Sequence, residues 1–368
     1  MVTTSARAVS LSSHSLGTRP ADELLRSIEA ADEVVLNLNR SFVASVSKIL
    51  LLAAALSRRE RQIRVVLPDG GATDSIRESS KQTLLEPLVL GANSDRTEAF
   101  SSSSVGVPEG GYVDRERRLF CVPTELLDRR DRETFRSDLA KWFRAAAIAL
   151  PPAEFDRVVA LGYEANTNSA EHGSTRQVDE GILDSRPVFR CLSARLHDEP
   201  GPALPDDANA YVREYSQAFR SRTRWLEMNV VDAGMGLAYP SFLVRARHFR
   251  SRCKNVYEAG FEAETGQFAE VLSRRISTKG HWGNVQSTAS VTGEGIPSIT
   301  KNIIRLRGFA SIRAGRCAAS LSAARVVEPS ERTVGIPEYR IQTQERAFFG
   351  GTAWQLLLPL DQQISLAL

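Results

Sequence analysis

The segment that most constrains the fold is a β-prone run that ends in a carboxylate and two glycines. Residues 226–231, Leu-Glu-Met-Asn-Val-Val, favour a strand, and Asp232-Ala-Gly-Met-Gly236 follows directly. Asp232 would present its carboxylate where the chain turns sharply, and Gly234 and Gly236 allow the backbone to approach a flat ligand. An ordinary Asp/Gly turn is the alternative interpretation.

A second segment, earlier in the chain, is predicted to form a helix over residues 153–170. Two prolines, Pro151 and Pro152, stand at its start, where a helix tolerates proline. Four apolar residues then recur at near-helical spacing: Phe155, Val158, Val159 and Leu161. Glu164, Asn168 and His172 are spaced i, i+4 and i+8 and therefore share one face. A carboxylate one turn from a carboxamide could activate water and offer oxygen ligands to Mg²⁺. A solvated polar helix face is the alternative.

A third segment, Gly293-Glu-Gly295, precedes an apolar helix pattern through Ile299, Ile303 and Ile304. Glycines before a helix N-terminus offer unhindered N–H groups to phosphate oxygens, and the helix dipole adds to the attraction. Pro297 is acceptable in a first helical turn and is interpreted as a helix-start signal.

Two further strands are predicted near the C-terminus. Residues 309–315 form one, and residues 350–359 form a turn and a buried strand that Pro359 would end. Thr352 lies at the start of the second strand. It could donate a hydrogen bond to a carboxylate or a bridging water, or it could simply be a threonine in a core strand.

In their order along the chain, first the helix with Glu164, then Asp232 and its glycines, then Gly293-Glu-Gly295 and last the turn and strand at residues 350–359, the four segments resemble the GHKL superfamily of ATPases. This superfamily includes gyrase, chaperone, histidine-kinase and mismatch-repair ATPases. The resemblance covers roughly residues 120–362. It implies a Bergerat ATP-binding fold, an α+β two-layer sandwich with a mixed sheet covered by helices, at residues 113–368. It also implies ATP and Mg²⁺ as cofactors.

The resemblance further implies roles for individual residues. Glu164 matches the general base, Asn168 the Mg²⁺ ligand, and Asp232 the carboxylate that accepts a hydrogen bond from the adenine amine. Lys279, in Ser277-Thr-Lys279-Gly280, resembles an element that precedes the glycine box in many histidine kinases and could reach the γ-phosphate, although a solvated surface lysine is the alternative. The remaining nucleotide-binding candidates are His172, Gly234, Gly236, Gly293, Gly295 and Thr352. Residues 237–292 take the place of the ATP lid.

The N-terminal part is predicted to be a separate module over residues 19–112, after a disordered tail over residues 1–18. Strands at 34–38 and 63–68 flank an apolar helix at 46–56, which indicates a small β-α-β crossover. The unit faintly resembles STAS-type regulatory domains. Ser45 and Ser47 fall where such domains can carry a phosphoserine, but the usual signature is absent, and a structural or protein-binding module is the alternative. Residues 91–112 are predicted to be a Ser/Gly-rich linker.

Charge and cysteine usage favour a cytoplasmic protein without a nucleic-acid partner. The chain holds 47 basic and 44 acidic residues, a net charge of +3, which gives no nucleic-acid signal. Its four cysteines are isolated from one another, as expected of reduced thiols. The longest apolar stretch, residues 49–56, is too short to cross a membrane.

Together these features predict a nucleotide-dependent switch in signalling or regulation that hydrolyses ATP slowly, with Glu164 as the general base. Two alternatives stay open. The chain could be a serine protein kinase of the anti-sigma-factor type, or a regulatory protein that binds ATP without hydrolysing it. A protein partner is expected at the N-terminal module or the lid, and homodimerisation stays open.

Overall fold

The computed structural model describes a mixed α and β protein. The described residues are 8–37, 44–57, 62–66, 99–101, 111–127, 131–172, 176–178, 182–184, 189–198, 204, 206–219, 223–234, 236, 261–273, 295–324, 339–342 and 344–360.

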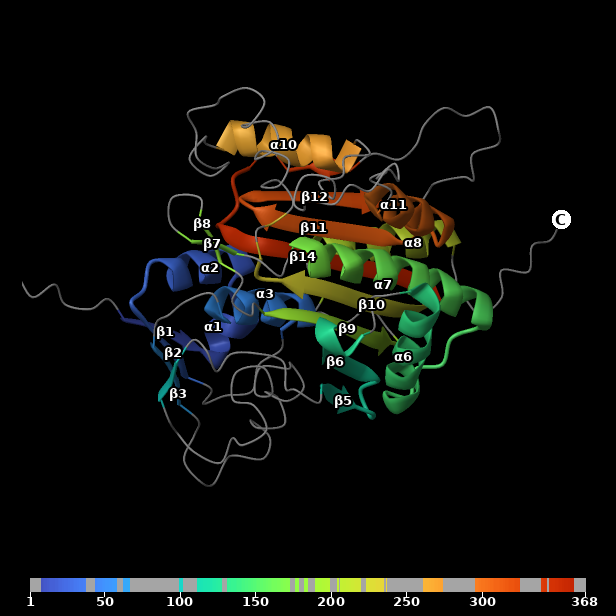
Figure 1. Ribbon diagram of the computed structural model, residues 1–368, viewed down its shortest axis with the longest axis horizontal. Helices are drawn as coiled ribbons and strands as arrows, with labels where there is room; N and C mark the ends of the chain where they lie inside the picture. Colours follow the sequence, from blue (N-terminus) through green and yellow to red (C-terminus); the bar gives the residue numbers. More distant parts are fainter. Residues whose placement is uncertain are drawn as a thin grey trace, which may run out of the picture.

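Eight strands among these residues form one large sheet at the centre of the molecule (Figure 1). In spatial order they are β13 (Arg340–Ile341), β12 (Cys317–Ser322), β11 (Phe309–Gly315), β14 (Phe349–Leu360), β10 (Arg224–Asp232), β9 (Arg190–His197), β6 (Leu119–Pro123) and β5 (Tyr112–Asp114). Every neighbouring pair is antiparallel, so the expected mixed sheet is not found here.

The strand predicted to end at Pro359 continues through it to Leu360. Proline cannot donate to a sheet ladder and is excluded from strand positions where a neighbour needs its N–H. The pairing of β14 with β11 ends at Leu357, whereas its pairing with β10 continues through Pro359. Pro359 therefore lies past the end of the pairing with β11, and no carbonyl of β11 needs an N–H from it.

One face of the large sheet, which we call the front face, carries Leu226, Met228 and Val230 of β10. It packs against α7 (Pro152–His172), α6 (Arg132–Ala145), α11 (Gly295–Arg305) and α10 (Phe261–Ser273) in one apolar cluster. Asp131 caps α6 by accepting a 2.7 Å hydrogen bond from the Thr134 N–H. The predicted helices at 153–170 and after Gly295 are both confirmed, and Pro297 lies in the first turn of α11.

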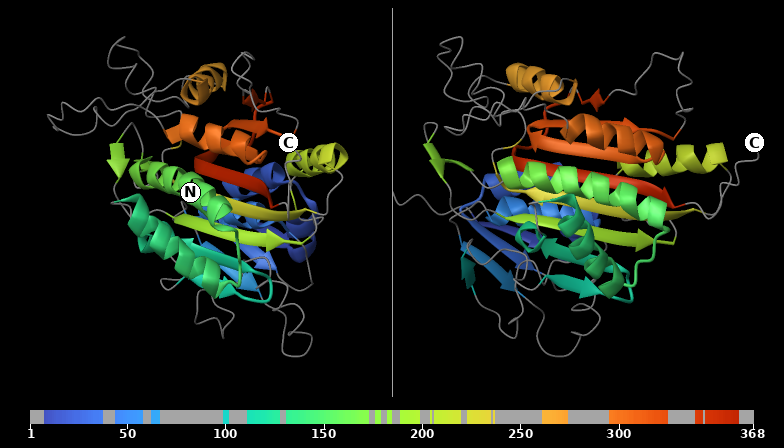
Figure 2. Two further views of the ribbon diagram at one scale, coloured as in Figure 1. Left: turned by 90° about the vertical axis from the view of Figure 1, so that its right-hand side faces the viewer. Right: turned by 45° about the vertical axis from the view of Figure 1, so that its right-hand side comes forward.

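The opposite face, the back face, is covered as well. The aromatic residues Tyr211 and Tyr215 of α8 (Asp206–Phe219) pack against Trp225 at one end of β10. Two N-terminal helices, α2 (Ala21–Glu29) and α3 (Val46–Ser57), cover the rest, so helices flank the sheet on both sides (Figure 2). The expected two-layer arrangement is thus extended by a further layer.

The N-terminal residues form a second, four-stranded sheet in the order β1 (Ala8–Ser12), β2 (Glu33–Asn37), β3 (Gln62–Val66) and β4 (Ala99–Ser101). Strands β1, β2 and β3 are parallel, and α3 connects β2 to β3, which confirms the β-α-β unit. The expected disordered tail is wrong for residues 8–18, which form β1 and α1 (Ser13–Thr18), because Leu11 and Leu16 are buried in the core. Strand β4 falls inside the expected linker, where it pairs with β3.

The N-terminal sheet and the large sheet share one hydrophobic core. A single apolar cluster joins Leu50 and Leu52 of α3 to Cys191, Val231 and other back-face residues of the large sheet. Ser45 and Ser47, considered above for phosphorylation, are 7% and 8% exposed, and both have hydrogen-bond partners. Ser45 Oγ accepts from the Lys48 N–H and caps α3, whereas Ser47 Oγ accepts from Gln355 of β14. These contacts favour the structural interpretation of both serines.

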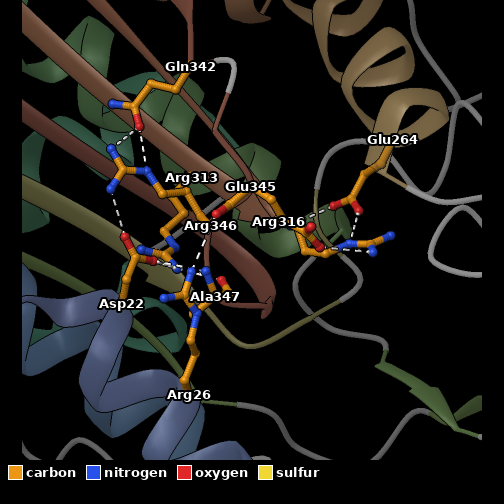
Figure 3. A network of polar contacts seen from close by, with 9 residues as sticks. All are labelled: Asp22, Arg26, Glu264, Arg313, Arg316, Gln342, Glu345, Arg346 and Ala347. Carbon is orange, nitrogen blue, oxygen red and sulfur yellow. Dashed lines mark hydrogen bonds and ion pairs between the residues drawn. The ribbon is translucent and has the colours of Figure 1, made fainter.

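A cluster of ionic contacts ties α2 to the large sheet (Figure 3). Asp22 accepts from Arg313 of β11 at 2.6 Å, from Arg346 at 2.8 Å and from the Ala347 N–H at 3.1 Å. Burial alone would raise the pKa of Asp22, but the charges and hydrogen bonds of the two arginines outweigh it and lower that pKa. We call this group of four residues the Asp22 clamp.

Helix α10 lies within the stretch predicted to be the lid, and it is packed against the sheet. Phe268 is buried in the front-face cluster, and the fully buried Glu264 accepts two hydrogen bonds from Arg316. The other residues of the stretch lie outside the described part of the chain. A separate hairpin consists of β7 (Arg176–Val178) and β8 (Ile182–Asp184).

Candidate functional site

The C-terminal half of α7 lies against the first residue of α11. A Cβ added to Gly295 would fall 3.2 Å from both side-chain atoms of the Asn168 amide and 3.4 Å from Glu164 Oε2. The structure therefore brings together three residues that the sequence predicted in two separate segments. Because Gly295 has no side chain, the two polar groups of α7 reach the backbone at the start of α11.

Asn168 Nδ2 is buried and has no hydrogen-bond partner in the described part of the chain. A buried amide without a partner is uncommon, and bound water, an ion or a ligand usually accounts for one. The side chain can offer both donors and an oxygen acceptor. Asn168 is thus available to a polar ligand at the start of α11.

Asp232 lies at the end of β10 on the front face, in direct register with Thr352 of β14. Its Oδ1 accepts from the Gly234 N–H at 3.0 Å and from the Thr352 N–H at 3.2 Å. Two backbone donors on one oxygen fix the orientation of the carboxylate. The contact with Thr352 comes from its backbone N–H, whereas the sequence left open a hydrogen bond from its hydroxyl or a purely structural role in the strand.

Glycines allow the backbone to come close at this point. A Cβ on Gly351 would overlap the carbonyl oxygen of Asp232, so no larger residue fits without a shift of the strands. Gly236 has a φ of 79°, in the left-handed region that glycine enters without strain. The turn after Asp232 therefore depends on glycine, as the sequence predicted.

Arg190 is a neighbour of Asp232 that the sequence analysis missed. The two residues are directly paired across β9 and β10, so their side chains share the front face. Burial lowers the pKa of Arg190, and the charge of Asp232 acts in the opposite direction. A partly buried cation thus lies beside the carboxylate. The pairing register locates it, and single-sequence patterns do not reveal register between strands so far apart in the chain.

Several other polar groups near this end of α7 are buried without hydrogen-bond partners in the described residues. They belong to Thr124, Asn166, Thr167 and Ser169. Thr124 belongs to the short 3-10 helix η2 (Thr124–Leu126), which contacts both α7 and β9. Asn166, Thr167, Asn168 and Ser169 thus form a run of buried polar side-chain atoms in the C-terminal half of α7 that lack partners among the described residues.

The two groups of site residues lie at the same end of the sheet. Helix α7 crosses β10 and β14, and its C-terminal half lies over the end of β10 that carries Asp232 (Figure 1). His172 is the last residue of α7, and the placement of its side chain lies outside what the structure describes, as do Lys279 and Gly293. Their predicted roles stay predictions.

The described residues contain no group of three or more His, Cys, Asp or Glu side chains that could hold a metal ion. None of the described helices has the length and apolar character needed to cross a membrane. Comparisons of the chain with protein-family models, with curated proteins and with solved structures found no match.

Proposed function

We propose that the front face binds ATP with Mg²⁺ beside the C-terminal half of α7, and that the protein acts as a nucleotide-dependent switch that hydrolyses ATP slowly. The observation that carries the proposal is the contact of Gly295 with Glu164 and Asn168. It places a carboxylate, a carboxamide and the N-terminus of an 11-residue helix at one point. A triphosphate with its cation needs this combination of groups.

Asp232 supports the adenine end of the proposed site. Its carboxylate is held by the N–H groups of Gly234 and Thr352, so it would accept a hydrogen bond from an exocyclic amine without reorganising. Guanine carries a carbonyl at the corresponding position. Its oxygen would face the carboxylate oxygen of Asp232, and two hydrogen-bond acceptors repel each other. The site should therefore prefer ATP to GTP.

Glu164 and Asn168 fit a bound Mg²⁺, because this cation takes oxygen ligands and commonly keeps several waters beside one or two protein groups. When bound, Mg²⁺ would neutralise part of the phosphate charge. The Asn168 amide would contribute its oxygen to the cation, and its buried Nδ2 would donate to a phosphate oxygen. Glu164 would accept the proton of an attacking water.

Calorimetric titration of the full chain with ATP and GTP tests the binding site. ATP should bind more tightly than GTP, and Asp232→Asn should weaken ATP binding by roughly 1–3 kcal/mol, the cost of an unmatched buried polar group. Asp156→Asn is the matched control, because Asp156 lies on α7 but is 54% exposed and pairs with Arg136. Equal ATP affinities of the wild type and Asp232→Asn would rule out the adenine assignment.

A measurement of ATP hydrolysis distinguishes an enzyme from a protein that only binds ATP. Glu164→Ala should keep ATP binding and lose about 10²- to 10⁴-fold in the rate of phosphate release, the usual effect of removing a general base. With γ-labelled ATP, label in free phosphate indicates an ATPase, and label on protein indicates a kinase. Unchanged phosphate release by Glu164→Ala would mean that the base lies elsewhere.

A further inference from the structure

A cleft of about 270 Å³ lies at the other end of the large sheet, between the β5–β6 turn and the end of β9. It is lined by Glu116, Arg117, Arg118, Arg195, Leu196, His197 and Asp198. Three arginines and a histidine, with two acidic residues, thus line one small space. The Leu196 N–H donates to the Arg118 carbonyl at 3.0 Å, which holds the two walls together.

The arginines of this cleft differ in how their charges are compensated. Arg117 pairs with Asp114 at 2.6 Å, and Arg118 pairs with Asp198 at 2.8 Å. Arg195 has no ion pair with any described residue, and its buried Nε has no hydrogen-bond partner among them.

The pKa of Arg195 is subject to opposing influences. Burial lowers its pKa, the nearby Glu227 and Asp114 raise it, and the positive charge of Arg117 lowers it again. The Glu227 carboxylate is already occupied, because it accepts hydrogen bonds from His197, Gln355 and Asn229. An anion in the cleft would give Arg195 an ionic partner that the described residues do not supply.

We propose that this cleft binds the phosphoryl group of a small phosphorylated molecule. The guanidinium fork matches the oxygens of a phosphoryl group, and such charge-assisted hydrogen bonds are among the strongest in proteins. The volume of about 270 Å³ is below the range of roughly 300–1,000 Å³ that drug-sized ligands occupy, so the occupant is small.

The cleft is separate from the proposed nucleotide site. Arg195 and Arg190 lie five positions apart on β9, a distance of about 17 Å along a strand, and their side chains lie on opposite faces of the sheet. The two proposals can therefore fail independently.

The cleft is also joined to the N-terminal module by a chain of hydrogen bonds. His197 Nε2 lies 2.9 Å from Glu227 Oε2, and Gln355 Nε2 donates to Glu227 Oε1 at 3.1 Å and to Ser47 Oγ at 3.2 Å. Ser47 in turn lies 3.2 Å from Ser45, the cap of α3. A phosphoryl group beside His197 would thus contact the first residue of a hydrogen-bond network that extends to α3. Its binding should stabilise the packing of the N-terminal module on the large sheet.

Titration of the full chain, followed by ³¹P NMR line widths at constant ionic strength, tests the proposal. The probes are inorganic phosphate and glycerol phosphate, and saturating ATP analogue keeps the proposed nucleotide site occupied. We expect both probes to bind, and Arg195→Gln to weaken binding roughly tenfold or more, as loss of a charged hydrogen-bond donor does. Tighter binding of glycerol phosphate would identify a phosphate ester as the occupant, and tighter binding of inorganic phosphate would identify the free ion.

Two further variants complete the test. Arg118→Gln replaces a side chain that is 36% exposed, so it should fold even where Arg195→Gln does not, and it should also weaken phosphate binding. Arg136→Gln removes an exposed arginine outside the cleft and should have no effect. The proposal is overturned if neither probe binds, or if all three variants bind phosphate as the wild type does. Arg195→Gln should keep ATP affinity, whatever the outcome at the nucleotide site.

Discussion

Asp22 and Arg313 are separated by 291 positions in the chain, yet their side chains meet at 2.6 Å on the back face of the large sheet. Their side chains are 14% and 11% exposed, so water screens the pair little. Arg346 and the Ala347 N–H share the same carboxylate. The contact joins α2 to β11 and to the residues that precede β14 (Figure 3).

Replacement of Asp22 should therefore destabilise the whole protein. We expect Asp22→Asn to lower the free energy of unfolding by about 2–3 kcal/mol. Breaking a fully buried ion pair costs roughly 3–5 kcal/mol, and the cost here should be smaller because both side chains keep some exposure. Urea unfolding measures the change. Asp156→Asn, which breaks an exposed pair, is the control and should have a smaller effect. Equal effects of the two variants would contradict a stabilising role for the clamp.

The same clamp predicts a dependence on pH. The pKa of Asp22 is lowered from its ordinary value of 3.8, so the ionised carboxylate binds its partners more favourably in the folded state. Its contribution is complete above that ordinary value and is lost as pH falls through the lower, folded pKa. The difference in stability between wild type and Asp22→Asn should thus be constant from about pH 7 to pH 5 and shrink below about pH 4. A difference that grew on acidification would have the wrong sign.

Gly295→Ala should impair nucleotide binding more than it impairs folding. The new Cβ would lie 3.2 Å from the Asn168 amide and 3.4 Å from Glu164, and both flexible side chains can move a few tenths of an ångström. That movement displaces the groups proposed to hold ATP and Mg²⁺. Gly266→Ala on α10 is the matched control, because nothing lies within 4 Å of its Cβ, and it should raise stability by roughly 0.5–1 kcal/mol. Equal ATP affinity in both variants would argue against a site at Gly295.

Thiol reactivity should report on the docking of the N-terminal module. Cys121 and Cys191 are buried in the cluster that includes α2 and α3, whereas Cys317 is buried in the front-face cluster, where burial raises its pKa to about 11. In a Cys253→Ser background, removal of residues 1–111 should make Cys121 and Cys191 react with a thiol reagent and leave Cys317 protected. Mass spectrometry after timed alkylation identifies the modified residues.

Either of two results would contradict this expectation. Equal reaction of all three thiols would mean that the large sheet does not persist without residues 1–111. Continued protection of Cys121 and Cys191 would mean that the N-terminal helices do not shield the back face. ATP titration of the same truncated chain shows whether the proposed site needs the module.

The spacing of apolar residues along the sequence predicted the helices and strands of the front face, but it did not predict which strands pair with one another. The apolar spacing before Glu164 predicted α7, and the β-prone run before Asp232 predicted β10, because both patterns are local. Arg190 escaped notice because its place beside Asp232 depends on the register between β9 and β10. Neither strand carries that register in its own sequence.

The sequence of α3 carries a signal for the docking of the N-terminal module. Helix α3 is apolar almost all round, with buried residues that include Ile49, Leu50, Leu52 and Ala53. A helix of this kind has no solvent face and must be covered on more than one side. A small β-α-β unit covers only one side, so the pattern already required a second surface. The identity of that surface, and the pairing of Asp22 with Arg313, depend on contacts between distant parts of the chain.

Strand β14 has a consequence for how the protein is made. It follows every other described element in sequence, yet it lies between β10 and β11, and all three apolar clusters contain its residues, for example Trp354, Ala353 and Leu357. A nascent chain on the ribosome has already released α3 when β14 is still to be synthesised. The apolar surfaces of α3, α7 and α8 therefore cannot pack against β14 until nearly the whole described chain has been translated.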